Sequence, residues 1–246
     1  MSVFWRTPDT YQPAGLERGT ATSTSTTTGT TSSFIPAGSS VLDVGGRKSW
    51  YTIGLPITVT VADLQREEEI QHELGLGVTP KIEEQLIKQR SNVAGMIYDD
   101  MAKTSIEPGS YDAIISVEVI EHVDDDAAFV KNMSRTIRPG GVAILTTPNG
   151  DRNPVPSGDH KRHYRRDQLE ELLTTSFDHV QVGYIVAATS NRLTGLKAMS
   201  PRHPQHAART ASANILNRFE SGRSGIAFKP GFAAHLIAVA ATNPPT

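Results

Sequence analysis

Short apolar segments alternate with segments of helical periodicity along most of the chain after residue 34. The apolar segments are rich in β-branched residues, and we expect strands at residues 41–44, 57–62, 93–98, 111–117, 142–147, 180–187 and 233–240. The expected helices are residues 64–74, 80–90, 124–137 and 166–174. The strands up to residue 147 are apolar on both faces, which is typical of a parallel sheet covered by helices. The pattern therefore predicts an α/β fold.

The composition changes at both ends of this pattern. Residues 1–33 contain a long Ser and Thr run that cannot bury apolar surface, so we expect a flexible N-terminal segment, acting as a flap or a tail. Residues 34–246 are then one domain with a basic insertion at about residues 191–231, in which one helix is expected at residues 208–219. The Pro-Gly-Gly segment at residues 139–141 is expected to be a simple turn.

Charge and composition exclude several classes of protein. Among the 246 residues, 24 Lys and Arg stand against 26 Asp and Glu, and a net charge of -2 gives no global attraction to nucleic acid or to an anionic membrane. The absence of cysteine excludes disulfides, thiolate nucleophiles and Cys-ligated zinc. No apolar stretch approaches the roughly 20 residues that span a bilayer, and the first residues lack the pattern of a signal peptide. We therefore expect a soluble, cytoplasmic protein.

Glycines and acids follow the expected strands, at the edge where an open parallel sheet binds its ligands. Gly45 and Gly46 follow the first strand and allow a ligand to approach the backbone. Asp63, after the second strand, can accept hydrogen bonds from both hydroxyls of a ribose. A carboxylate at Asp99 or Asp100, after the third strand, can accept from the exocyclic amine of an adenine. Together these residues predict a site shaped for adenosine.

Several motifs, in this order, resemble the class I S-adenosylmethionine-dependent methyltransferases. They are Val41-Leu42-Asp43-Val44-Gly45, Asp63, Asp100, Tyr111-Asp112-Ala113-Ile114-Ile115, Glu118-Val119-Ile120-Glu121-His122-Val123 and Arg138-Pro139-Gly140-Gly141. The chain looks most like the small-molecule group that includes the ubiquinone-pathway O-methyltransferases, over roughly residues 39–189. The resemblance implies a Rossmann-like, seven-stranded, mostly parallel sheet with helices on both faces and an antiparallel last strand. A nicotinamide-binding domain fits worse, because the loop lacks Gly-x-Gly-x-x-Gly.

The resemblance implies S-adenosylmethionine as the cofactor and gives roles to residues at the strand ends. Gly45 would pass beneath the methionine part of the cofactor, and Asp63 would bind the ribose hydroxyls. Asp100, with the backbone of Met101, would meet the adenine, and Val117 would line the methionine side. Capping of the helices that follow is the structural alternative for Asp43 and Asp63.

The glycine loop departs from the family pattern. Asp43 would orient this loop, and the family usually has three glycines spaced by single residues after that acid. Here those positions are Gly45, Arg47 and Ser49. A bulky residue at position 47 prevents the loop from following a ligand in the usual way. Gly46 takes over the role of the missing glycine, or Arg47 turns outward, and the sequence leaves this open.

Three histidines are candidate catalytic bases. Transfer of a methyl group to oxygen requires removal of a proton, best done by a group with a pKa near 7. His122 is expected at the start of a helix after the fourth strand, whereas His160 and His163 lie in a loop after the fifth strand. These strand ends face the same side of the sheet, although a structural role is the alternative for each histidine.

A metal site is an alternative use of the same region. Glu118, Glu121, His122 and His160 resemble the metal-binding set of the small-RNA 3′-terminal 2′-O-methyltransferases. Two carboxylates and two imidazoles can hold a divalent ion that binds ribose hydroxyls. The basic insertion would then contact phosphates, but it has few aromatic residues to stack on bases, which argues against RNA.

We therefore expect a methyltransferase that acts on a hydroxyl, or less favourably an amine, of a small molecule. An anionic small molecule is among the acceptors that the basic insertion suits. The alternatives are the metal-dependent RNA enzyme and a non-catalytic binding module that kept the fold. The sequence does not define the oligomeric state.

Overall fold

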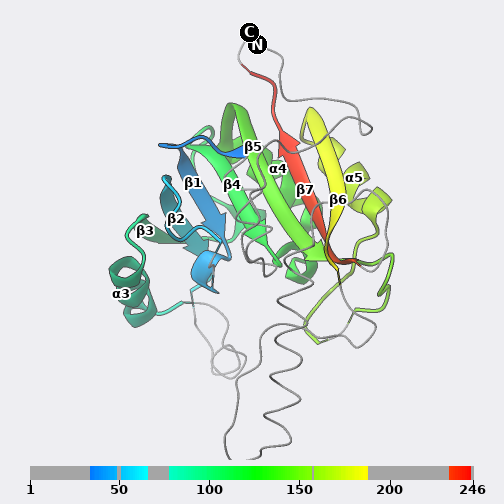
Figure 1. The fold of residues 1–246 in the computed structure, drawn as a ribbon, viewed down its shortest axis with the longest axis horizontal. Coiled ribbons are helices and arrows are strands. Elements are labelled where there is room, and N and C mark those ends of the chain that lie inside the picture. Colours follow the sequence, from blue (N-terminus) through cyan, green and yellow to red (C-terminus); the bar gives the residue numbers. More distant parts are fainter. Residues whose placement is uncertain (1–33, 49–50, 66–77, 157, 188–232, 245–246) are drawn as a thin grey trace, which may run out of the picture.

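A computed structural model of the chain describes residues 34–48, 51–65, 78–156, 158–187 and 233–244 (Figure 1). The expected N-terminal segment, the basic insertion with its helix, and all but the first two residues of the expected helix 64–74 lie outside the described residues. Of those two, Leu64 is not helical and Gln65 forms an isolated bridge with Val78.

The described residues form one seven-stranded sheet with the order β3-β2-β1-β4-β5-β7-β6. Its strands are β1 (Ser40–Val44), β2 (Thr58–Asp63), β3 (Val93–Tyr98), β4 (Tyr111–Val117), β5 (Ile137–Pro148), β6 (His179–Ala187) and β7 (Ala233–Ala241). Only β7 runs antiparallel to its neighbours, β5 and β6. The predicted mostly parallel sheet with an antiparallel last strand is therefore confirmed.

Three α-helices connect the described strands: α3 (Pro80–Gln89), α4 (Asp126–Thr136) and α5 (Arg166–Thr174). Proline at the first turn suits α3, because its missing N–H has no intrahelical partner there. The N-cap of α4 is Asp125, whose carboxylate accepts from the backbone N–H of Ala128 at 2.9 Å. The helices expected at residues 80–90, 124–137 and 166–174 are confirmed. In Figure 1, α3 lies beside β3 and α5 lies beside β6, at the two ends of the sheet.

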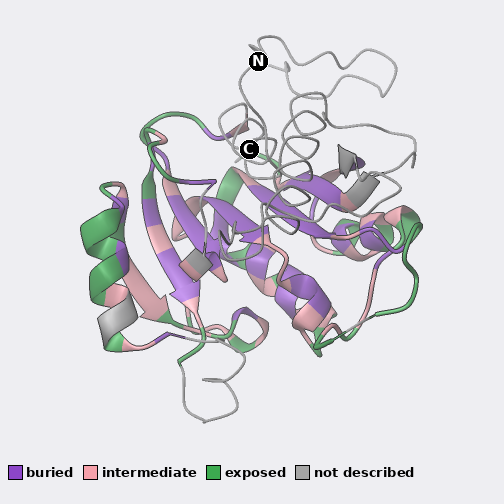
Figure 2. Cartoon of the chain, turned by 60° about the horizontal axis from the view of Figure 1, so that its bottom comes forward, coloured by how far each residue is buried: buried purple, intermediate pink, exposed green. Residues whose placement is uncertain are grey.

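Two apolar layers pack on the two faces of the sheet. In Figure 2 most of the central strands are coloured as buried. Leu42 and Ile114 point into the layer that contains Phe129 and Met133 of α4, together with residues of α5. Their neighbour Val41 points into the opposite layer. This alternation follows from the two-residue period of a strand, and it makes each central strand apolar on both faces.

The segment at residues 139–141 is not the separate turn that the sequence indicates. It lies inside β5, where the pairing with β4 shifts from Tyr111 opposite Ile137 to Ala113 opposite Val142. The extra residues of β5 form a bulge, and Gly140 adopts a φ of +82° within it. A Pro-Gly-Gly triplet indicates an irregular backbone but does not say whether the strand resumes in the same pairing.

The strand order reverses at β1, which pairs with β2 on one side and with β4 on the other. All three strands are parallel, so their carboxyl ends lie at one edge of the sheet. Crossover connections leave the two sides of β1 in opposite directions, which opens a crevice at this edge. The fold therefore brings the segments that follow β1, β2, β3 and β4 together. No helix within the described residues is long and apolar enough to cross a membrane.

Candidate active site

Two glycines follow β1, and close contacts leave no room for a side chain at either position. Gly45 adopts a φ of +71°, and a Cβ there would lie 2.5 Å from Cγ2 of Val119, beyond the end of β4. A Cβ on Gly46 would overlap the carboxylate of Asp43. The Gly45 N–H donates to the carbonyl of Ala62 at 2.8 Å, which ties the start of the loop to β2. The loop is therefore packed against both neighbours of β1.

Asp43 lies beneath this loop and is fully buried. The Tyr51 hydroxyl donates a hydrogen bond to its Oδ1 at 3.0 Å. A buried carboxylate so close to the loop fixes the position of Gly46, because no side chain fits between them. That Asp43 orients the loop for the cofactor stays a prediction from the motif.

Asp63 and Asp100 are placed at the same edge by the pairing of β2 with β3. Asp63 is opposite Tyr98 in the register, and its carbonyl accepts from the N–H of Asp99 at 3.1 Å. Asp100 follows directly, and its Oδ1 accepts from the N–H of Ala102 at 3.0 Å. Asp100 thus caps a short 3-10 helix, η2 (Met101–Lys103), whose first residue is buried. Both expected nucleoside-binding acids lie at one edge of the sheet.

Arg47 does not turn outward, which was one of the two alternatives. Its Nε lies 3.9 Å from Oδ2 of Asp63, and the two side chains are only 14% and 15% exposed. Oδ1 of Asp63 accepts from the N–H of Leu64 at 2.8 Å. The guanidinium therefore lies next to the acid that is expected to bind the ribose.

Glu118 follows β4 in a strained backbone conformation with a φ of 55°, in the left-handed region that favours glycine. The Thr146 hydroxyl donates to its Oε1 at 2.9 Å, and Nδ1 of His235 lies 3.0 Å from its Oε2. Burial raises the pKa of Glu118, but His235 and Thr146 outweigh this and lower it. Burial likewise opposes charge on His235, yet the Glu118 carboxylate raises the pKa of that histidine. The two groups therefore form an ion pair.

Glu121 is the buried carboxyl group of this region. It is 0% exposed, and the Thr147 hydroxyl donates to its Oε2 at 3.2 Å. Its Oε1 makes no hydrogen bond to any residue in the described part of the chain. Burial, and then the nearby charge of Glu118, raise the pKa of Glu121 to about 9. Without a cation, this group is therefore protonated at neutral pH.

His122 ends a three-residue 3-10 helix, η3 (Ile120–His122), rather than beginning an α-helix as expected. Its Nδ1 lies 3.2 Å from Oδ2 of Asp159 in the loop after β5. Its ring meets the ring of His160 edge-on, with the ring centres 4.7 Å apart. The fold therefore brings the two expected histidine positions together. The short helix ends at once because Val123 is extended and α4 starts only after the Asp125 cap.

Hydrogen bonds define the protonation of the other two histidines. Nδ1 of His163 lies 2.7 Å from the backbone carbonyl of Asn153, which only accepts, so this nitrogen carries a proton. In the neutral ring, Nε2 of His163 then accepts from Nδ1 of His160 at 2.8 Å. Burial, and then His122 and His163, lower the pKa of His160. Neutral His160 consequently keeps a lone pair on Nε2.

Three of the four expected metal ligands converge. Ligand atoms of Glu121, His122 and His160 all lie within 4.8 Å of one another. Glu118 is not part of this group, because both of its oxygens are bound by Thr146 and His235. The expected set of four is therefore corrected to three.

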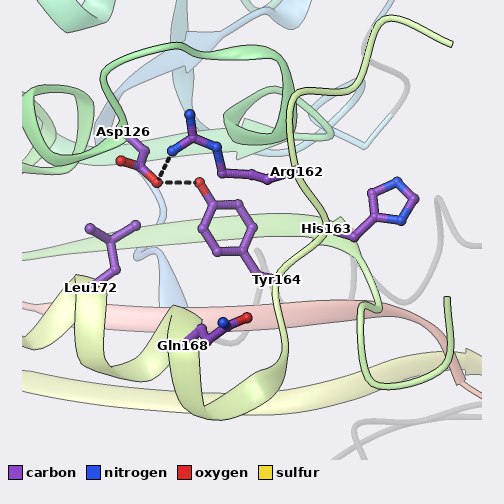
Figure 3. Close-up of a pocket in the computed structure, with 6 residues that line it drawn as sticks. All are labelled: Asp126, Arg162, His163, Tyr164, Gln168 and Leu172. Carbon is purple, nitrogen blue, oxygen red and sulfur yellow. Dashed lines mark hydrogen bonds and ion pairs between the residues drawn. The ribbon is translucent and has the colours of Figure 1, made fainter. Parts of the chain in front are cut away.

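A cavity of about 340 Å³ lies beside this region, between α4 and α5 (Figure 3). Inside it, Oδ2 of Asp126 accepts from the Tyr164 hydroxyl at 2.7 Å and pairs with Arg162 at 2.5 Å. Figure 3 shows these three side chains pointing at one another, while the ring of His163 is turned away. The charges in this cavity compensate each other. These contacts anchor the loop that carries His160 and His163, here called the histidine loop, to α4, and we assign the cavity no role in the reaction.

Sequence reasoning missed several residues of this region. The missed residues are Arg90, Thr146, Thr147, Asn153, Asp159 and His235. His235 had a detectable signal: in an antiparallel last strand, the first residues lie at the carboxyl edge of the other strands. Thr146 and Thr147 also end an expected strand. Arg90 had none, because it acts through a contact with a loop distant in the sequence. Asn153 had none either, because only its backbone carbonyl takes part in the contact with His163. Val117 ends β4 and packs against an apolar layer, and its role beside the methionine part of the cofactor stays a prediction.

Comparisons with known proteins agree with this geometry. A family described as "Methyltransferase domain" matches residues 26–190, which is more than half of the chain. This chain belongs to the methyltransferase family. A probable S-adenosylmethionine-dependent methyltransferase of Mycolicibacterium smegmatis is 34% identical over 85 residues, covering 32% of this chain and 33% of that protein. The resemblance drawn from the motifs is thereby confirmed.

Two further comparisons show how much of the chain is similar to known proteins. A ubiquinone biosynthesis O-methyltransferase of Rickettsia typhi is 46% identical over 80 residues, covering 26% of this chain and 32% of that protein. The matched segments thus span about a third of either curated relative. A solved structure from Thermotoga maritima, a possible histamine N-methyltransferase, has a TM-score of 0.57 at 13% identity and covers 88% of both chains. At that identity the likeness supports the methyltransferase fold alone.

The glycine loop gives the first prediction. The variant Gly45→Ala should lose about 2–4 kcal/mol of stability, because it adds a clash with Val119 to the strain of a positive φ. The control is Gly54→Ala, where φ is +75° and no atom lies within 4 Å of the added carbon. Urea unfolding should show a cost of about 1 kcal/mol for the control. Adding Val119→Ala to Gly45→Ala should recover part of the difference. Equal costs for the two single variants would contradict the packing described here.

Proposed function

We propose that this methyltransferase transfers a methyl group from S-adenosylmethionine to a hydroxyl of a small molecule. The proposal is supported by one observation: two groups of residues, each forming half of a site, meet at one edge of the sheet. The ends of β1, β2 and β3 supply a glycine loop and acids suited to adenosine. The segments after β4 and β5 supply a neutral imidazole. The contact between Gly45 and Val119 joins the two halves.

The residues present fit the cofactor. Gly45 carries no side chain that would stand between its backbone and a ligand, and carboxylates are offered by Asp63 at the end of β2 and by Asp100 just after β3. S-adenosylmethionine, when bound, supplies a methyl group already activated by a positive sulfur. The protein then has to bind, orient and deprotonate, and orientation alone supplies a large part of the rate of such transfers.

His160 is the base that the geometry supports best. The chain of hydrogen bonds from the Asn153 carbonyl through His163 fixes the ring of His160 and leaves the lone pair on its Nε2. The proton of an acceptor hydroxyl passes to this nitrogen. His163 is a positioning residue, since its own Nε2 is occupied by the bond to His160. His122, held by Asp159, is the second imidazole that can meet the acceptor.

The presence of a base at this position favours a hydroxyl acceptor over an amine. A neutral amine carries its own lone pair, whereas an alcohol or phenol gains nucleophilicity when its proton leaves. The similarity to ubiquinone biosynthesis O-methyltransferases, although limited to part of the chain, supports the same acceptor class.

Binding of S-adenosylhomocysteine tests the proposal. The unchanged chain should bind it in calorimetry and gain thermal stability. Asp63→Asn should weaken binding about 10–100-fold, because hydrogen bonds to a charged group are worth about 1.5–3 kcal/mol. Asp124→Asn is the control, because Asp124 is 85% exposed and pairs only at the surface with Lys161. No binding by the unchanged chain at millimolar ligand would refute the cofactor and favour a non-catalytic module.

The base is tested with a panel of phenols and alcohols, following the S-adenosylhomocysteine formed. His160→Gln should lower kcat at least about 100-fold, within the range for loss of a general base, and leave cofactor affinity unchanged. Free imidazole should restore part of the activity of His160→Gly. His163→Ala should lower kcat less, because the base is then present but poorly oriented. A base role for His160 fails if His160→Gln retains full kcat.

A metal-assisted version of this reaction is a second candidate, and one observation favours it. Glu121 is buried with an oxygen that has no partner among the described residues, and it faces two imidazoles. Nδ1 of His122 and Nδ1 of His160 are engaged by Asp159 and His163. Such outer hydrogen bonds are typical of histidines that bind a metal through the other nitrogen. A cation there would polarise an acceptor hydroxyl. The RNA specificity considered above has no comparable support.

Metal titration tests this candidate. After treatment with EDTA, the chain should bind one Zn²⁺ or Mn²⁺ in calorimetry, since two imidazoles and a carboxylate suit such ions. Glu121→Gln should weaken binding at least about tenfold, the usual cost of losing a ligand or its support. His179→Gln is the control, since this histidine lies on β6 and bonds Asn243. If the chelated chain binds neither ion at micromolar concentration, the metal candidate is excluded.

A further inference from the structure

A buried arginine from outside the glycine loop holds the backbone of that loop. Arg90 follows α3 and is 7% exposed. Its Nη1 donates to the carbonyl of Gly46 at 3.0 Å, and its Nη2 donates to the carbonyl of Arg47 at 2.9 Å. The planar guanidinium thus binds two successive carbonyls with two parallel bonds, which a lysine cannot do.

The position of Arg90 is electrostatically constrained. Burial lowers the pKa of Arg90, and the Asp43 carboxylate and Tyr51 offset this lowering only in part. A buried guanidinium is costly unless a charge and hydrogen-bond acceptors compensate it. Here Asp43 beneath the loop provides the charge, and the loop carbonyls provide the acceptors. The loop is therefore part of the compensation that keeps this side chain inside the protein.

The loop needs this contact because its own sequence does not define its shape. Gly45 is tied to β2 through Ala62, but the 3-10 helix that follows, η1 (Gly46–Lys48), has only three residues. With Arg47 in place of a glycine, the backbone there can place a long side chain in several directions. Because Arg90 holds the carbonyls on either side of the Arg47 N–H, that side chain is directed at Asp63.

We propose that Arg90 is a positioning residue for the cofactor, and that it replaces the missing glycines by holding the loop backbone from outside. Through the backbone it also directs Arg47 toward the acid that binds the ribose. This inference rests on the proposed function, since it concerns the same cofactor.

The variant Arg90→Lys tests the inference. It keeps a positive charge near Asp43 but lacks the planar fork whose two nitrogens each bind one carbonyl. We expect the dissociation constant of S-adenosylhomocysteine to rise about tenfold or more in calorimetry well below the unfolding temperature, as loss of a charged hydrogen bond predicts. The Michaelis constant of a phenol acceptor should stay within about twofold, because the acceptor half of the site is unchanged.

Asn92→Ala is the matched control. Asn92 lies in the same turn, and its Nδ2 donates to the carbonyl of Thr52 at 2.6 Å rather than to the glycine loop. Its loss should lower thermal stability without changing cofactor affinity. If Arg90→Lys binds S-adenosylhomocysteine as tightly as the unchanged chain, Arg90 is merely structural and the inference is wrong, while the proposed function stands. If the unchanged chain does not bind the ligand, both fail.

A measurement on the unchanged chain covers the case in which Arg90→Lys does not fold. Backbone hydrogen exchange should be slow at residues 45–48 before any ligand is added, because Arg90 already orders them. Addition of S-adenosylhomocysteine should slow it by less than about threefold. Fast exchange that becomes slow only with ligand would mean that the cofactor, and not Arg90, orders the loop, and would overturn the inference.

Discussion

The pairing of β1 with β2 on one side and β4 on the other is the constraint on which this molecule depends. Parallel strands end at the same edge of the sheet, so the segments that follow them lie close together. One side of β1 carries the acids suited to a nucleoside, and the other carries the carboxylates and histidines of the proposed acceptor half. Gly45 and Val119 touch across the boundary, so the loop and the end of β4 are positioned together.

Three buried or half-buried carboxylates at this edge are compensated in different ways. Asp43 has the Tyr51 hydroxyl and the charge of Arg90. Glu118 has His235, and each keeps the other charged. Glu121 accepts from the Thr147 hydroxyl but faces no compensating cation among the described residues, so burial, and then the charge of Glu118, raise its pKa to about 9. Asp43 and Glu118 stabilise the loop and the strand ends. The charge of Glu121, by contrast, depends on whether it binds a proton or a cation.

The segment at residues 149–165, after β5, shows how local contacts orient a histidine ring. Asp126, Arg162 and Tyr164 anchor the loop to α4. Anchored in this way, the loop places His160 between His122 and His163. Burial, and then the neighbouring His122 and His163, lower the pKa of His160, so this imidazole is a modest base. In the proposed role it would suit phenols and activated alcohols better than unactivated ones.

The sequence by itself determined the order of strands and helices, the acids at the strand ends and the family. Apolar runs, caps and turns are local signals that mark the elements along the chain, and the motifs at the strand ends implied the family and, with it, the seven-stranded sheet. Tertiary structure alone decided that residues 139–141 form a bulge, that Glu118 pairs with His235, and that Arg47 faces Asp63. It also recruited Arg90 to the loop. Each of these depends on a contact between segments far apart in the chain, where the outcome is set by the balance of burial against charge compensation, and no local pattern encodes that balance.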